Sequence, residues 1–344
     1  MIIKINKNKF DKFFKILKGN YDVFAPIGDG MNSKFSRVKS IKEINLDISN
    51  TDKSPKEIFF PQTEILFNFE SQKINLNAEK NKSFAVWGMR PCDAKSLTLI
   101  DKIFGSAKQK PNDENFEDPY WKSKYDDALI FSIGCNTPAS TCFCNWFESG
   151  PFEKIGSDIF VVNTDEYYLM EAVSEKGKVF LKKVTDFEKG IKKDEEKITE
   201  LKKRAESYLK KSVDLKALDN VIEEIWGNPV WDELSNKCIN CGACTFICPT
   251  CHCFDIQDEG KEKAGKRIRL WDSCMFPDFT GEASGHNPRL LSKDRFRQRF
   301  MHKFKYFPDN NDDYLCTGCG RCIYVCPVNV DIREVVEKIV KCES

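Results

Sequence analysis

The sequence predicts an α/β domain over residues 1–185, followed by a mainly α-helical, cysteine-rich domain over residues 227–344. Three observations predict this division. Short apolar runs alternate with a helical pattern up to about residue 185, charged residues dominate the next segment, and twelve of the 16 cysteines follow residue 227. A chain of 344 residues is also long enough for two domains with separate cores.

The α/β domain is predicted from alternating helical and strand patterns. Phe10, Phe13, Phe14 and Leu17 recur at helical spacing, and YDVFAP (21–26) then has the composition of a strand. Further apolar runs, bounded by polar residues, glycine or proline, predict strands: EILFNF (64–69), SFAVWGM (83–89), ALIFSIG (128–134) and DIFVVN (158–163). Between two of these runs, DAKSLTLIDKIF (93–104) predicts a helix.

Residues 186–226 are predicted to form a helical connector between the domains. Charged residues dominate here, and Ile191, Ile198, Leu201 and Ala205 form only a thin apolar stripe. Such a pattern is typical of a solvated helix that lies across a molecule.

Composition and the N-terminal residues exclude several classes of protein. MIIKINKNKFDKFF alternates charged with apolar side chains, unlike a signal peptide, and no apolar stretch approaches the roughly 20 residues of a membrane span. We therefore expect a cytoplasmic protein without membrane contact. The net charge of +1 also argues against nucleic-acid binding. In a reducing cytoplasm, clustered cysteines indicate metal ligands or redox groups.

Two cysteine runs of identical spacing, C-x2-C-x2-C-x3-C-P, lie in the second domain. Bacterial ferredoxins use this run to hold [4Fe–4S] clusters, and the fourth cysteine of each run reaches the other cluster. We therefore assign one cluster to Cys238, Cys241, Cys244 and Cys326, and a second to Cys316, Cys319, Cys322 and Cys248. The alternative is a pair of structural zinc sites, which more often use C-x2-C pairs with longer spacers. The runs predict a ferredoxin-like dicluster domain.

A long insertion, residues 254–310, separates the two runs. It ends in a basic segment in which Arg295, Arg299 and His302 recur at helical spacing, with Phe296, Phe300 and Phe304 on an apolar face. These basic residues have two interpretations. They form a solvated helix face, or they place positive charge beside anionic clusters, where it stabilises the reduced forms or docks a partner.

Eight further cysteines have no ferredoxin spacing. Cys92 follows one predicted strand, and Cys135, Cys142 and Cys144 follow another, so these four could converge where strands of one sheet end. We favour a third [4Fe–4S] cluster there over inert buried cysteines with a single metal clip. Cys251, Cys253 and Cys274 are either an extra metal or redox site, completed by His252 or an external ligand, or core residues, while the remaining Cys342 is a plain thiol.

Several catalytic and nucleotide-binding motifs are missing from the sequence. No G-x-G-x-x-G follows a predicted strand, and there is no P-loop, H-E-x-x-H or G-x-S-x-G. Only three histidines are available for acid–base chemistry. We therefore expect no flavin or NAD bound by this chain, and an electron-transfer role rather than a catalytic one.

The chain resembles a known family, the iron–sulfur beta subunit of cytosolic sulfhydrogenases, and a relative of that family, the iron–sulfur subunit of anaerobic sulfite reductase. The strings that carry the resemblance are FFPQTEILFNF (59–69), RPCD (90–93), TCFC (141–144), CPTCHCFDI (248–256), RLWDSC (269–274), GHNPR (285–289), RFRQRFMHKF (295–304) and CTGCGRCIYVCPVNVDI (316–332). Several of them lie outside the runs that any ferredoxin shares. Those around Cys92, Cys135, Cys142 and Cys144 strengthen the third-cluster hypothesis.

The resemblance implies a non-catalytic iron–sulfur subunit of a soluble, anaerobic oxidoreductase complex. A flavin subunit that binds NAD(P) would lie on one side, and a terminal reductase or hydrogenase subunit of sulfite reductase, NiFe hydrogenase or heterodisulfide-reductase type on the other. Two other functions stay open: a catalytic disulfide or sulfur reductase that uses Cys251, Cys253 and Cys274, and a redox-sensing interaction protein.

Overall fold

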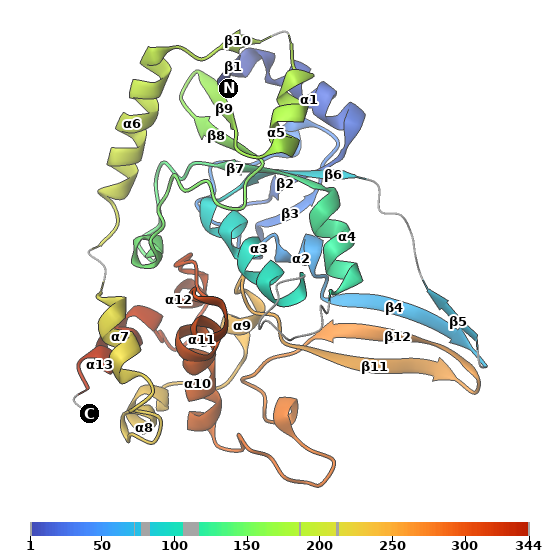
Figure 1. The fold of residues 1–344 in the computed structure, drawn as a ribbon, viewed down its shortest axis with the longest axis vertical. Helices are drawn as coiled ribbons and strands as arrows, with labels where there is room; N and C mark the ends of the chain where they lie inside the picture. Colours follow the sequence, from blue (N-terminus) through green and yellow to red (C-terminus); the bar gives the residue numbers. More distant parts are fainter. Residues whose placement is uncertain are drawn as a thin grey trace.

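The computed structural model describes residues 2–71, 73–76, 83–105, 117–185, 187–210 and 213–342. Parts of the expected domains and connector, residues 106–116 and 211–212 among them, lie outside these residues. The described chain contains an eight-stranded sheet in the N-terminal half, a four-stranded sheet that projects from the body, and a helical C-terminal region (Figure 1). The predicted mixed α/β architecture is confirmed.

The eight-stranded sheet has a parallel centre and antiparallel edges. Its strand order is β10-β1-β9-β8-β7-β6-β2-β3, and β2, β6, β7 and β8 pair in parallel. The strands are β1 (Ile2–Asn6), β2 (Asp22–Ile27), β3 (Lys34–Arg37), β6 (Phe84–Met89), β7 (Ala128–Ile133), β8 (Ile159–Asn163), β9 (Tyr167–Ala172) and β10 (Glu188–Lys189). Neighbouring parallel strands end at the same edge, which brings the loops after β6 and β7 together.

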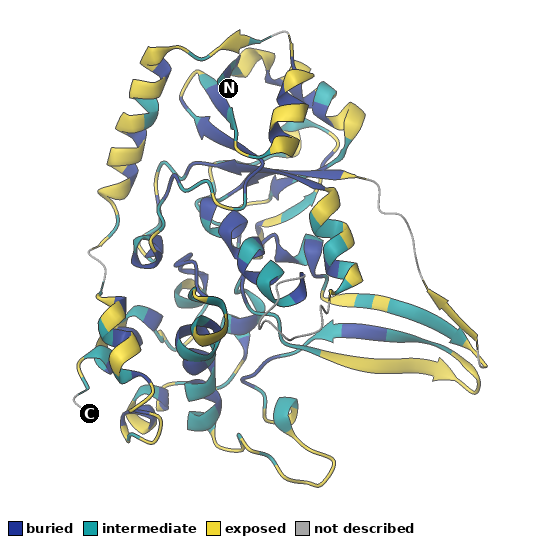
Figure 2. Cartoon of the chain, viewed as in Figure 1, coloured by how far each residue is buried: buried dark blue, intermediate teal, exposed yellow. Residues whose placement is uncertain are grey.

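Helices cover both faces of this sheet, and its centre is buried (Figure 2). Alternate strand residues point to opposite faces, so Trp87 packs with α1 and α5 while Val86 packs with α3 and α4. The helices are α1 (Phe10–Asn20), α2 (Lys56–Phe59), α3 (Pro91–Phe104), α4 (Pro119–Asp127) and α5 (Glu175–Lys182). The predicted spacing of phenylalanines in α1 is the buried stripe of that helix.

The second sheet joins distant parts of the sequence. Its order is β11-β12-β4-β5, with β4 (Thr63–Glu70), β5 (Lys73–Leu76), β11 (Phe254–Lys261) and β12 (Ala264–Trp271). The predicted strand EILFNF therefore forms, but it pairs with the insertion rather than with the central sheet. Buried Arg269 of β12 holds this register, because its guanidinium donates to Glu64 and to Asp118. The insertion is thus partly β, although its sequence predicts a mainly helical region.

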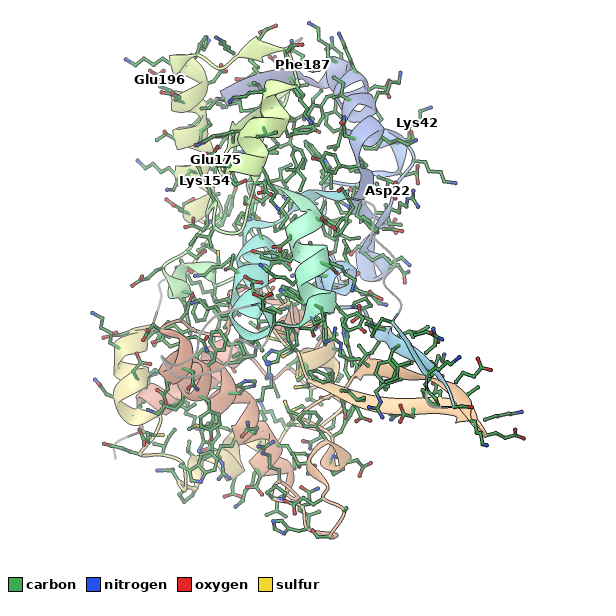
Figure 3. All side chains as sticks on the ribbon, turned by 45° about the vertical axis from the view of Figure 1, so that its right-hand side comes forward. Asp22, Lys42, Lys154, Glu175, Phe187 and Glu196 are labelled. Carbon is green, nitrogen blue, oxygen red and sulfur yellow. The ribbon has the colours of Figure 1, made fainter. Side chains whose placement is uncertain are left out.

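The connector forms the predicted amphipathic helix, α6 (Lys192–Glu206), along one side of the molecule (Figure 1). Its thin stripe buries Leu201 and Ala205 against the central sheet. The charged side chains of Lys42, Glu175 and Glu196 extend outward from the N-terminal half (Figure 3). They are exposed, as expected of a solvated surface.

The C-terminal region packs short helices around phenylalanine and aliphatic side chains. The helices are α7 (Leu215–Val221), α8 (Val230–Ser235), α9 (Ala243–Phe246), α10 (Ser292–Met301), α11 (Phe307–Asn311), α12 (Arg321–Tyr324) and α13 (Ile332–Val340). A π-helical turn, His302–Tyr306, joins α10 to α11. Phe296, Phe300 and Phe304 enter the core, as their spacing predicts. Across the described ranges, no helix combines the length and apolar character of a membrane span.

Candidate metal centre

The first run of cysteines surrounds a cavity, here called site 1. Its lining includes Cys238, Cys241 and Cys244, together with Cys326 from the end of the second run. Cys241 is exposed, so site 1 approaches the molecular surface. The fourth cysteine of the second run thus lies with the first three of the first run, which is the grouping that the spacing predicts.

The second run surrounds a deeper cavity, site 2. Cys316, Cys319 and Cys322 line it, and Cys248 completes the set from the first run. Cys316 and Cys319 are each 9% exposed. The crossing of Cys248 and Cys326 locks the two runs into one unit.

Both runs use left-handed backbone at equivalent positions. Gly242 and Gly320 precede the third cysteine of their runs, each with φ of +74°, and each begins a short helix, α9 or α12. A β-carbon on Gly320 would lie 2.4 Å from the carbonyl oxygen of Thr141. The second run therefore needs glycine both for its turn and for its contact with the N-terminal half.

We expect Gly320→Ala to lower the free energy of unfolding by about 1–3 kcal/mol, because it combines backbone strain with a steric clash. The control is Gly227→Ala, where an added β-carbon meets no atom within 4 Å. Urea unfolding of both variants under anaerobic conditions measures the difference. Equal midpoints would contradict the proposed tight contact.

The four cysteines of the α/β domain surround a third cavity, site 3. Cys92 lies at the start of α3 after β6, Cys135 follows β7, and Cys142 and Cys144 come from the next loop. Parallel pairing of β6 with β7 explains the convergence, because both strands end at one edge. Burial raises the pKa of the Cys142 and Cys144 thiols to about 12, so metal binding there must displace protons.

The three cavities lie in a row. Cys319 lines both site 3 and site 2, while Cys322 and Arg299 line both site 2 and site 1. The backbone N–H of Phe143, in the site 3 loop, donates to the carbonyl oxygen of Gly318 at 2.8 Å. Neighbouring sites are therefore separated by one layer of residues.

Sequence reasoning missed Asn50, which bridges sites 2 and 3. Its side-chain amide lies 3.7 Å from the sulfurs of Cys92 and Cys142 and donates to the carbonyl oxygen of Cys319 at 2.8 Å. Asn50 comes from a loop between β3 and α2 with no motif of its own. No local signal could have identified it.

Buried positive charge accompanies the cysteines. Arg299, Lys303 and Arg321 are only 6%, 3% and 3% exposed, so the interpretation of a solvated basic face does not describe them. The Lys303 ammonium lies 3.4 Å from the sulfur of Cys248. Burial opposes its charge, but Cys248, Cys251 and Cys316 outweigh that cost and raise the pKa of Lys303. The sequence analysis did not single out Lys303.

The other two predicted basic residues have different surroundings. Arg295 donates to the carbonyl oxygens of Met275, Arg289 and Leu290, so it ties loops together. His302 stacks on His252 with ring centroids 5.3 Å apart, and burial lowers its pKa to about 3. It is therefore neutral at pH 7 and adds no positive charge.

The structure divides the remaining trio of cysteines into two contacts. The Cys251 thiol hydrogen bonds to Cys248, beside site 2, whereas Cys253 hydrogen bonds to Cys274. His252 faces the carbonyl oxygen of Thr250 at 3.1 Å through Nδ1. Among the residues with described positions, no group of three or more His, Cys, Asp or Glu side chains is arranged to hold a metal ion.

The donor set and its surroundings fit [4Fe–4S] clusters. Each cavity has four thiols, the ligand type of such clusters, and contains about 430, 310 or 330 Å³ of space between protein atoms for sites 1, 3 and 2. Within the described chain, Arg299 Nε and Thr317 Oγ1 are buried beside site 2 without a hydrogen-bond partner. Donors left free beside a cavity match an anionic group with acceptor sulfurs.

Comparisons with known proteins agree with this geometry. Residues 237–330 match the model of the 4Fe-4S dicluster domain family, which spans sites 1 and 2. The chain is 30% identical over 339 residues to sulfhydrogenase 2 subunit beta of Pyrococcus furiosus, a match that covers 98% of each chain. No solved structure matches it. The chain therefore belongs to the family of sulfhydrogenase beta subunits and carries a 4Fe-4S dicluster domain.

Proposed function

We propose that this chain is the electron-transfer subunit of a cytoplasmic oxidoreductase complex. It relays electrons between a flavin- and NAD(P)-binding subunit, on one side, and a terminal reductase or hydrogenase subunit on the other. The observation that carries the proposal is the row of three four-cysteine cavities, in which each neighbouring pair shares a lining cysteine. The curated relative is itself one subunit of a sulfhydrogenase, which supports a complex with other chains.

The proposed ligand sets follow the cavities. Cys238, Cys241, Cys244 and Cys326 hold the cluster of site 1, and Cys316, Cys319, Cys322 and Cys248 that of site 2. Cys92, Cys135, Cys142 and Cys144 hold the cluster of site 3. Bound [4Fe–4S] clusters supply one-electron redox chemistry.

The chain's own residues set the conditions for that chemistry. They exclude water from site 2, where Cys316 and Cys319 are buried, and they hold the guanidinium of Arg299 between sites 1 and 2. Fixed positive charge favours the more negative, reduced state of a neighbouring centre. Exposed Cys241 at site 1 gives one end of the row access to the surface.

Iron analysis with a single substitution tests the proposal. We expect about twelve irons per chain after anaerobic purification, because three cubanes hold four each. Cys142→Ser should lower the content to about eight and remove one EPR signal, since Cys142 lines site 3 alone among the three cavities. The control is Cys342→Ser, whose sulfur contacts the carbonyl oxygen of Lys338 and lines none of the three cavities.

Two outcomes would contradict parts of the proposal. About eight irons in the unmodified chain, unchanged by Cys142→Ser, would remove the cluster of site 3. A colourless chain that contains zinc would overturn the electron-transfer function. Anaerobic co-purification, followed by identification of the bound chains, tests the flavin and terminal subunits.

A further inference from the structure

Cys253 and Cys274 form a thiol pair that the proposed clusters do not use. Cys253 immediately precedes β11, and Cys274 lies three residues after β12. The pairing of Phe254 with Trp271, and a hydrogen bond from Asp272 N–H to the Cys253 carbonyl oxygen at 3.0 Å, close the base of the hairpin. This closure brings the two cysteines into one core, where their side chains hydrogen bond to each other.

The pair lies against the loop of site 1. Ser273, next to Cys274, hydrogen bonds to Thr245 at 2.7 Å between their hydroxyl oxygens, and Thr245 follows Cys244. Met275, on the other side of Cys274, lines site 1. A β-carbon on Gly242 would meet the Ser273 hydroxyl at 3.2 Å, so the two segments pack closely. Only a few side chains therefore separate Cys274 from the site 1 cavity.

The two sulfurs differ in acidity. A hydrogen bond from the Cys274 thiol, opposed by burial, lowers the pKa of Cys253 to about 7, and the same contact raises the pKa of Cys274. Cys253 is partly exposed whereas Cys274 is buried. A thiolate next to a thiol is the arrangement from which a disulfide forms by two-electron oxidation.

We propose that Cys253 and Cys274 are a redox-active dithiol–disulfide couple beside site 1. Oxidation forms one S–S bond, removes two electrons and releases the protons of both thiols. Reduction breaks that bond with two electrons and restores the protons from water. The reductant is a pair of reduced iron–sulfur clusters of this chain, each of which gives one electron. The electron source rests on the proposed function, whereas the thiol chemistry does not.

The couple gives the chain a two-electron store beside one-electron carriers. Cys251 is not part of it, because its thiol contacts Cys248 at site 2. The catalytic role considered for all three cysteines therefore narrows to one pair.

Thiol labelling under controlled potential tests the couple. The anaerobic full-length chain is equilibrated in glutathione buffers of graded potential, alkylated, digested and analysed by mass spectrometry. We expect a peptide linked through Cys253 and Cys274 that becomes half reduced above about −300 mV, the range of labile rather than structural disulfides. Cys342 should stay unlinked. A pair that remains reduced at every potential, or that is linked only to other cysteines, would overturn the proposal.

An electron count tests the connection to the clusters. Starting from the oxidised chain, titration with dithionite should consume about two more electrons in the unmodified protein than in Cys253→Ser. Cys342→Ser should match the unmodified protein. Equal consumption by Cys253→Ser and the unmodified chain would overturn the proposal. Iron analysis of the same samples separates the two hypotheses: a chain without iron but with the labelled disulfide retains the couple and loses the proposed function.

Discussion

Arg321→Met is expected to destabilise the protein by about 3–5 kcal/mol, because it leaves a buried carboxylate without its partner. Arg321 and Asp93 are 3% and 0% exposed, and two hydrogen bonds of 2.5 and 2.9 Å join them. The Arg321 guanidinium also donates to the carbonyl oxygen of Thr51 at 2.7 Å. The pair links α12 of the C-terminal region to α3 of the α/β domain, so its loss should also loosen the contact between sites 2 and 3.

Urea unfolding under anaerobic conditions measures this effect, and two further variants make it specific. Arg267→Met removes an ion pair with Asp258 on the exposed hairpin, where water replaces the lost contact, so its midpoint should barely move. Adding Asp93→Leu to Arg321→Met should restore part of the stability, because it removes the uncompensated charge. Equal midpoints for Arg321→Met and Arg267→Met would contradict the role of the buried pair.

Lys303→Met is expected to lower the reduction potential of the site 2 cluster. The ammonium donates to the Cys248 sulfur at 3.4 Å, to Thr250 Oγ1 at 3.0 Å and to the carbonyl oxygen of Leu315 at 3.0 Å. Reduction adds negative charge, which this cation stabilises. Loss of about 1.4 kcal/mol of that stabilisation corresponds to roughly 60 mV for a one-electron couple. EPR-monitored titration of the anaerobic protein measures the shift.

The control for this prediction is Lys305→Met, on the same π-helical turn. The Lys305 ammonium forms ion pairs with Glu223 and Asp309 instead of contacting a cysteine. Its removal should leave the potential of site 2 unchanged. A Lys303→Met protein that retains its iron and shows an unchanged or raised potential would show that Lys303 does not tune the cluster.

The sequence predicted local structure well where the pattern was periodic or the spacing was repeated. The phenylalanine spacing in residues 10–17 became α1, and the apolar runs at 83–89 and 128–134 became β6 and β7. The two C-x2-C-x2-C-x3-C-P runs adopt matching turns, with glycine at φ +74° in each. These features depend on neighbours within a few residues, which the sequence displays directly.

Other features depend on partners far along the chain. The strand Thr63–Glu70 was predictable, but its pairing with Ala264–Trp271 was not, since the alternation of a strand does not name its neighbour. Asn50 had no motif, and Lys303 was one lysine among many until the π-helical turn directed it toward Cys248. The trio of Cys251, Cys253 and Cys274 divided for the same reason.

The sequence by itself determined that this protein gathers thiols in two repeated runs and a third group, because cysteine spacing alone limits which sulfurs can surround a common centre. Only the tertiary structure decided that the three groups form a row and share Cys319 and Cys322 as walls. It also decided that Arg321, Lys303 and Arg299 are buried beside them. The physical reason is that burial and charge pairing arise from packing between segments far apart in the sequence, which no local pattern encodes.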